Sequence, residues 1–328
     1  MDVVLHLADD YLLDRLWAMA WPAPRGMGVA KAASPSQAVI ANVSSHLGSA
    51  WGKEPSQWTG HAGKAVSALP RDNIIRQALS LSLITYVGIF ILYFGFAGLS
   101  YYFFFNHDMK RHPRFLPNQV RLEIDCSLRA FGPLTLMTLP WFVGEVRGYS
   151  MLYTKVSDFG LAYTIFSVPF FLVFTDACIY WVHRLEHHPK VYKHIHKPHH
   201  KWLVPTPFAS HAFHPLDGYF QSLPYHIFVF LFPLHRFVYM GLFVFVNCWS
   251  ILIHDSDVIV NSPLEKVING PSHHTLHHLY FNVNYGQYFT GCDRLGGSYR
   301  QPRSSDDPLL DVTGKGEPKP LPKAQKSE

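Results

Sequence analysis

The sequence predicts an all-α integral-membrane protein with about four transmembrane helical segments and a cytosolic, histidine-rich helical cap. Hydrophobic residues make up 48% of the 328 residues and charged residues only 16%, below the roughly 25% usual in soluble domains. Several uncharged stretches are long enough to cross a bilayer. Sixteen of the 21 histidines lie between His183 and His278, so they are strongly clustered.

The first predicted span covers residues 79–105, a run of 27 residues without a formal charge. That length suffices to cross a hydrocarbon core, and the alternative is a buried helix of a soluble protein. Residues 130–144 are a weaker apolar stretch, interrupted by Pro133 and Pro140. We expect a second span there.

Two further apolar stretches follow. Residues 159–182 contain one acid, Asp176, and residues 224–253 carry two histidines and an arginine near their middle. A bent pair of half-helices fits the latter better than one straight crossing, because polar groups must avoid lipid. The two ends of this bent segment would then lie on the same side of the membrane.

The chain divides into three predicted parts. Residues 1–78 are an amphipathic and irregular segment whose first helix either lies on a membrane through Leu12, Leu16 and Trp17 or packs on the soluble side. Residues 79–300 form a membrane-embedded catalytic domain, and residues 301–328, rich in Pro, Lys, Asp and Ser, form a disordered tail.

Charge predicts the orientation. Basic residues at 110, 111 and 114 follow the first span, which places that loop in the cytosol and the amino terminus in the lumen, where the sequon at Asn42 is open to glycosylation. Both histidine-rich regions, 183–214 and 254–278, then face the cytosol. The net charge of +5 is modest and no basic block carries interleaved aromatics, which excludes a nucleic-acid partner.

Spacing divides the histidines into three sets. On a helix, partners three or four residues apart project from one face, as a shared metal site requires. A single pair is often a surface coincidence, but eight imidazoles on one side of a membrane exceed what one tetrahedral ion uses and indicate two metal ions with open positions. The sets are His183 and His187; His196, His199 and His200; His274, His277 and His278.

Imidazole alone does not identify the metal, since zinc, copper, iron and nickel all accept it. A histidine-rich metal transporter is an alternative from another class, although its ligands would be spread over the spans. The four cysteines form no CxxC pair and are expected to be free thiols.

These sets resemble the three histidine boxes of the fatty acid hydroxylase and sterol desaturase superfamily, with the strings HRLEH, HKPHH and HTLHH. The surrounding sequence is more similar to that of fungal sterol C5-desaturases. It comprises AFHPLDG at 212–218, HHTLHHLYFNVNYGQYFT at 273–290 and DRLGGSYR at 293–300. A sister oxidase with the same boxes, a sterol C4-methyl oxidase or a lipid hydroxylase, is the alternative.

The resemblance implies an O₂-dependent non-haem di-iron enzyme of the endoplasmic reticulum membrane. It would introduce the C5=C6 double bond into Δ7-sterols of the episterol type in ergosterol biosynthesis. Electrons would come from NADH through cytochrome b5 and its reductase, and Lys190, Lys193, Lys197 and Lys201 are candidates for docking acidic cytochrome b5.

The resemblance also implies a ligand set: the eight box histidines and His254. Relatives often have a further histidine where this chain has Ser250, so His211 or His214 is an alternative tenth ligand. Asp176 lies seven residues before His183 and is expected to accept a hydrogen bond near the metals or to orient a helix end. Glu186 is expected to be solvated, and Cys292 replaces the usual tryptophan.

Overall fold

The computed structural model describes residues 1–24, 67–260 and 262–314, which are mostly helical. The chain divides into two compact units, Val3–Ser80 and a larger one of Met1–Asp2 with Leu81–Glu328. The sequence placed the start of the catalytic domain at residue 79. Asn42 and the end of the predicted tail lie outside the described residues.

In the smaller unit, α1 (Asp2–Ala8), a π-helical turn (Asp9–Leu13) and α2 (Asp14–Ala20) follow one another. Leu12 and Leu16 are exposed, as expected for an amphipathic helix, whereas Trp17 is buried. The Trp17 indole donates a hydrogen bond to Ser80 at 2.9 Å, and Arg76 pairs with Asp9 at 2.8 Å. Trp17 therefore packs within the protein, which agrees with the second of the two alternatives for this helix.

The first predicted span is a continuous helix, Ile74–Phe103, made of α4 (Ile74–Leu92), a π-helical turn (Tyr93–Ala97) and α5 (Gly98–Phe103). This helix and α7 (Gly160–Glu186) are each long and apolar enough to cross a membrane. Helix α6 (Gln119–Val146) contains the second predicted span and runs unbroken through Pro133 and Pro140. Each proline removes only one backbone donor, and neighbouring elements pack along this helix.

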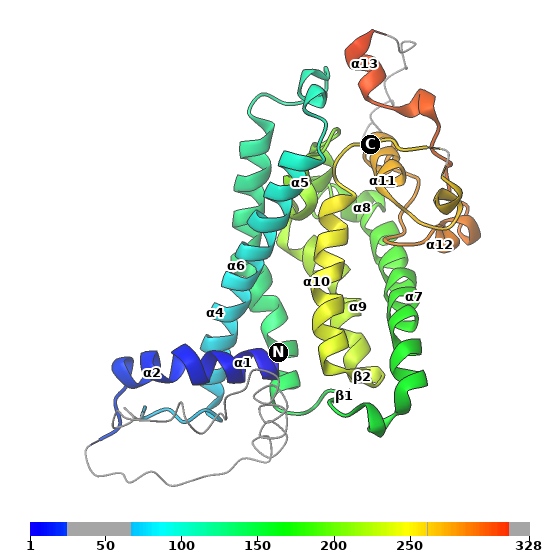
Figure 1. The fold of residues 1–328 in the computed structure, drawn as a ribbon. Coiled ribbons are helices and arrows are strands. Elements are labelled where there is room, and N and C mark those ends of the chain that lie inside the picture. Colours follow the sequence, from blue (N-terminus) through cyan, green and yellow to red (C-terminus); the bar gives the residue numbers. More distant parts are fainter. Residues whose placement is uncertain (25–66, 261, 315–328) are drawn as a thin grey trace. The chain divides into compact units, whose positions relative to one another are not determined.

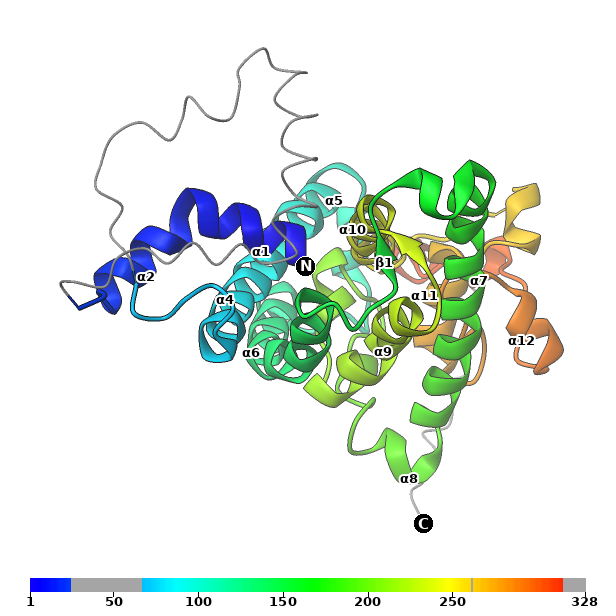
Figure 2. The same ribbon diagram turned by 90° about the horizontal axis from the view of Figure 1, so that it is seen from below.

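The segment expected to be a bent pair forms two separate helices, α9 (Pro215–Leu231) and α10 (Arg236–Leu252). The chain reverses at β2 (Leu234–His235), which pairs in parallel with β1 (Leu152–Tyr153). In Figure 1 α10 overlaps α9, and the rings of His226 and Phe243 join the two helices with their centroids 6.2 Å apart. In the view of Figure 2, α9 lies between α6 and α7, both of which it contacts.

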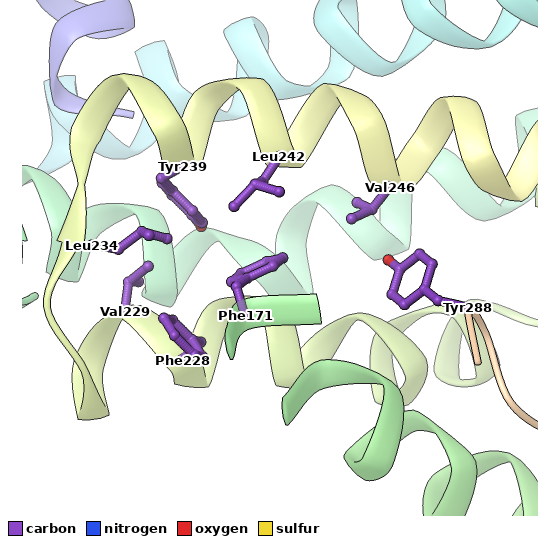
Figure 3. Close-up of a cluster of buried hydrophobic side chains, with 8 residues drawn as sticks. All are labelled: Phe171, Phe228, Val229, Leu234, Tyr239, Leu242, Val246 and Tyr288. Carbon is purple, nitrogen blue, oxygen red and sulfur yellow. The ribbon is translucent and has the colours of Figure 1, made fainter. Parts of the chain in front are cut away.

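A hydrophobic core joins α7, α9 and α10. Phe171 of α7 meets Phe228 and Val229 of α9, while Tyr239 and Leu242 approach from α10 (Figure 3). Leu234, Val246 and Tyr288 complete the cluster. Burying so many large apolar and aromatic side chains fixes the three helices against one another, and with them the helix ends that carry the histidines.

Short helices lie beyond one end of these long helices, as Figure 1 shows for α8, α11 and α12. The α-helices there are α8 (Pro189–Tyr192), α11 (Pro271–Tyr280), α12 (Gly291–Leu295) and α13 (Leu309–Thr313). Among the described residues, the 3₁₀ helices are His107–Arg111, Val156–Asp158, His199–Lys201, Pro207–His211, Pro263–Lys266 and Ser304–Asp306.

Within the predicted tail, the described residues 301–314 include the 3₁₀ helix Ser304–Asp306 and helix α13. Asp306 is buried and pairs with Arg300 at 3.0 Å, and Asp311 pairs with His112 at 3.2 Å. Ion pairs thus connect this segment, in which apolar residues are scarce, to the rest of the chain.

Candidate metal centre

Nine histidines meet in two groups, and they are the nine named from the sequence. In each group the ligand nitrogens lie within 4.8 Å of one another. The five-histidine group contains His183, His187, His196, His200 and His277, and the four-histidine group contains His199, His254, His274 and His278. The structure therefore places together the set expected to hold two metals.

Each sequence set of three contributes to both groups. His196 and His200 belong to the five-histidine group, while His199 between them belongs to the other. In the third set, on α11, His277 separates in the same way from His274 and His278. The second set lies in turns and a 3₁₀ helix after Pro198 rather than on one α-helical face. Two centres are thus built side by side from the same short segments.

Hydrogen bonds on the outer ring nitrogens fix the tautomers. His183 Nδ1 donates to the carbonyl of Tyr285 at 2.9 Å, and His277 Nδ1 to that of Val283 at 2.7 Å. His254 Nδ1 donates to the carbonyl of Ser250. A carbonyl only accepts, so Nδ1 carries the proton and the Nε2 of each neutral ring presents a lone pair. Ser250, which stands where relatives often have a histidine, thus supports His254 through its backbone carbonyl and provides no imidazole ligand of its own.

The Nε2 atoms point at one another. Those of His183 and His196 are 3.1 Å apart, and those of His254 and His274 are 2.9 Å apart. Nitrogens bound at about 2.1 Å to one ion would lie roughly 3.0–3.4 Å apart, depending on its geometry. Because Nδ1 holds the proton in both His183 and His196, which donate to the Tyr285 carbonyl and to Asp217, the contact between their Nε2 atoms brings two lone pairs together, as ligands around a cation do.

Burial keeps the imidazoles neutral, which is the form that binds metal. Burial and the neighbouring imidazoles hold the pKa of His199 and His278 well below its usual value. The pKa of His254 falls to about 3, mainly because the ring is buried. The unprotonated state, and with it the capacity to bind metal, therefore persists at any physiological pH.

Two buried carboxylates lie beside the five-histidine group. Asp217 accepts a hydrogen bond from His196 Nδ1 at 2.8 Å, and a carboxylate oxygen of Glu186 lies 3.9 Å from that nitrogen. Glu186 is buried, which corrects the expectation that it is solvated. Within the described residues, His196 is the only ionisable partner within ion-pair distance of either carboxylate. Burial raises the pKa of both carboxyl groups, that of Glu186 to about 11, so each stays ionised only beside positive charge, which bound metal ions would supply.

Asp217 was missed as a site residue, although the string AFHPLDG was noted. Asp217 lies before the segment 224–253 in which helices were expected, although an acid two residues after Pro215 is typical of a first helical turn. The contact to His196, 21 residues earlier, depends on how α9 packs against the turn after α8, and sequence spacing does not reveal that.

The three remaining sequence candidates lie outside the two groups. Asp176 accepts hydrogen bonds from the backbone of residues 287–289 rather than from a histidine. His211 contacts Ser210 and Asn247, and the ring of His214 caps the start of α9 by accepting from Leu216 N. None of the three belongs to a group of potential metal ligands among the described residues.

The four cysteines are free, as expected, and Cys292 is partly buried in α12. Its neighbour Asp293 accepts hydrogen bonds from the backbone of Tyr285 and Gly286, each at 2.8 Å. Cys292, which replaces the usual tryptophan, thus lies next to a residue that holds the Tyr285 segment, and this segment contacts the five-histidine group.

Comparisons with known proteins agree with the geometry. The fatty acid hydroxylase family model matches residues 168–298, which contain all nine histidines. A Delta(7)-sterol 5(6)-desaturase of Gibberella zeae is 46% identical over 310 residues, which cover 94% of this chain and 92% of that protein. No solved structure matches.

Further relatives carry related names. A Delta(7)-sterol 5(6)-desaturase of Leptosphaeria maculans is 50% identical, covering 92% of this chain and 86% of its own. Lathosterol oxidase of Mus musculus is 55% identical over 72% of this chain and 79% of its own. The chain therefore belongs to the fatty acid hydroxylase family, in the branch that contains the Delta(7)-sterol 5(6)-desaturases and lathosterol oxidase.

Proposed function

We propose that this protein is a sterol C5(6)-desaturase that introduces the C5=C6 double bond into Δ7-sterols. The observation that carries the proposal is the pair of imidazole groups, built from the segments that match desaturases at 46–55% identity. The reaction removes one hydrogen from C5 and one from C6. With two electrons and two protons from a donor, these reduce O₂ to two water molecules.

The nine histidines would hold two iron ions, which supply the oxygen activation needed to break an unactivated C–H bond. Zinc fits the same ligands but cannot change its oxidation state. The other contacting residues of the chain orient the imidazole rings. The carbonyls of Tyr285 and Val283 hold two rings, Asp217 holds a third, and burial of the cluster excludes bulk water.

The proposed setting is the endoplasmic reticulum membrane, with about four spans and the histidine cap in the cytosol. Exposed apolar side chains along Ile74–Phe103 and α7 suit a lipid environment and give a flat, hydrophobic sterol access from the bilayer. Residues 1–78, 79–300 and 301–328 remain the proposed division into amino-terminal segment, catalytic domain and tail.

Cytochrome b5 and its reductase are the proposed electron donors, with NADH as the source. Four lysines support this choice because they are exposed and lie in the segment that carries the second histidine set, where an acidic partner would approach the metals. They are Lys190, Lys193, Lys197 and Lys201.

Sterol profiling of a deletion strain tests the function. Loss of the protein should make Δ7-sterols without the C5 double bond accumulate at the expense of ergosterol, and microsomes should convert episterol to its 5,7-diene with O₂ and NADH. Accumulation of 4-methyl sterols with normal 5,7-diene formation would assign the protein to the sister oxidase instead.

A further inference from the structure

The segment 283–289, between α11 and α12, supports two histidines of the five-histidine group. As described above, the carbonyls of Val283 and Tyr285 accept the Nδ1 protons of His277 and His183. Movement of this segment would therefore turn both rings and displace their Nε2 atoms from the position where they converge.

Two carboxylates hold this segment. Five consecutive backbone N–H groups, those of residues 285–289, donate to one or the other. Asp293 accepts from the first two. Asp176 on α7 accepts the next three through a single oxygen, from Gln287 at 2.9 Å, Tyr288 at 2.6 Å and Phe289 at 3.2 Å. Hydrogen bonds to a charged acceptor are the stronger kind, and both carboxylates are buried.

The backbone of the segment admits little change. Asn284 has a left-handed φ of 55°, which asparagine tolerates better than most residues, and its side chain bridges to Arg300. At Gly286, an added Cβ would lie 2.5 Å from the carbonyl oxygen of Phe289 and 3.0 Å from the Asp293 carboxylate. The segment is therefore built for one conformation.

We propose that Asp176 and Asp293 are positioning residues for one metal of the pair. They fix the 283–289 segment, its carbonyls fix the outer nitrogens of His183 and His277, and the inner nitrogens then converge on the ion. In the described part of the chain, no ring nitrogen of the four-histidine group hydrogen-bonds to this segment, and its His254 is held by the carbonyl of Ser250 instead. The inference rests on the proposed metal centre and assigns both carboxylates to its five-histidine half.

Metal counting in purified, iron-loaded protein tests this. Wild-type protein should hold two ions, and Asp176→Ala about one, because the five-histidine group loses its alignment. Adding His187→Ala to Asp176→Ala should cause no further loss, since both act on the same group, whereas adding His278→Ala should remove most of the remaining metal. Asp176→Asn keeps the oxygen that accepts all three N–H groups and should restore the count toward two.

Glu123→Gln is the matched control. Glu123 is also a buried helical carboxylate that holds a distant backbone N–H, that of Thr206, but it does not contact the 283–289 segment. It should keep two ions. If Asp176→Ala does not yield folded protein, Gly286→Ala displaces the same segment and should show the same selective loss.

Two ions in folded Asp176→Ala, or equal loss from both groups, would overturn the inference while leaving the proposed function standing. Wild-type protein that is active as a desaturase without binding metal would overturn the proposed centre itself. Mössbauer spectra give an independent readout, because only one of the two iron signals should change in Asp176→Asn.

Discussion

Replacing Asp217 by asparagine should weaken metal binding at the five-histidine group by about 10–100-fold, or about 1.4–2.7 kcal/mol. The carboxylate serves two donors with separate oxygens, His196 Nδ1 at 2.8 Å and Gln221 Nε2 at 2.6 Å. Asparagine has only one acceptor oxygen and no charge. Gln221 can rotate its amide to adapt, so the main loss is the charged hydrogen bond that orients His196 and raises its basicity.

Chelator competition with Fe(II) under anaerobic conditions measures this change. Glu123→Gln is the control, because Glu123 is a similarly buried carboxylate that accepts hydrogen bonds from Gln119 and from the backbone of Thr206 instead of from a histidine. The control should bind iron like the wild type. Unchanged affinity in Asp217→Asn, or an equal loss in both variants, would refute the reasoning that Asp217 acts through His196.

Four further outcomes are expected. His199→Ala should abolish turnover while the protein still inserts into membranes, as judged by carbonate extraction and activity assay, and retained activity would contradict its role as a ligand. Burial lowers the pKa of His211 to about 4, so His211 is protonated in the unfolded chain at a higher pH than in the folded protein. Through this group, metal-free protein should lose about 1.4 kcal/mol of stability per pH unit below about pH 6.5. Melting curves of His211→Asn should therefore show a shallower pH dependence. Protease added to sealed microsomes should remove a tag placed after Glu328, and protection of the tag would overturn the orientation. Glutamate at the four exposed lysines should raise the KM for cytochrome b5 at low ionic strength with unchanged metal content; an unchanged KM would exclude this docking surface. The lysines are Lys190, Lys193, Lys197 and Lys201.

The histidines show how far the sequence led. Spacing and resemblance named all nine that the structure brings together, because three sets at helical spacing are a local signal. Their division into groups of five and four was not foreseeable from spacing. His199 and His200 are neighbours in the chain but belong to different groups, and only the three-dimensional path after Pro198 separates them.

The carboxylates show where the sequence was insufficient. Glu186 was expected in solvent because it lies off the histidine stripe of its helix, yet the turn that carries His196 covers it. The contacts of Asp176 and Asp217 join segments more than 20 residues apart, and no local pattern encodes such pairing. Long apolar helices were predictable, whereas the passage of α6 through Pro133 and Pro140 depends on tertiary packing.

The iron content of protein purified with its desaturase activity intact tests the central claim most directly. Two groups of imidazoles, each with converging Nε2 atoms, predict two iron ions per chain. Fully active protein that carries one iron or none would contradict the two-metal centre.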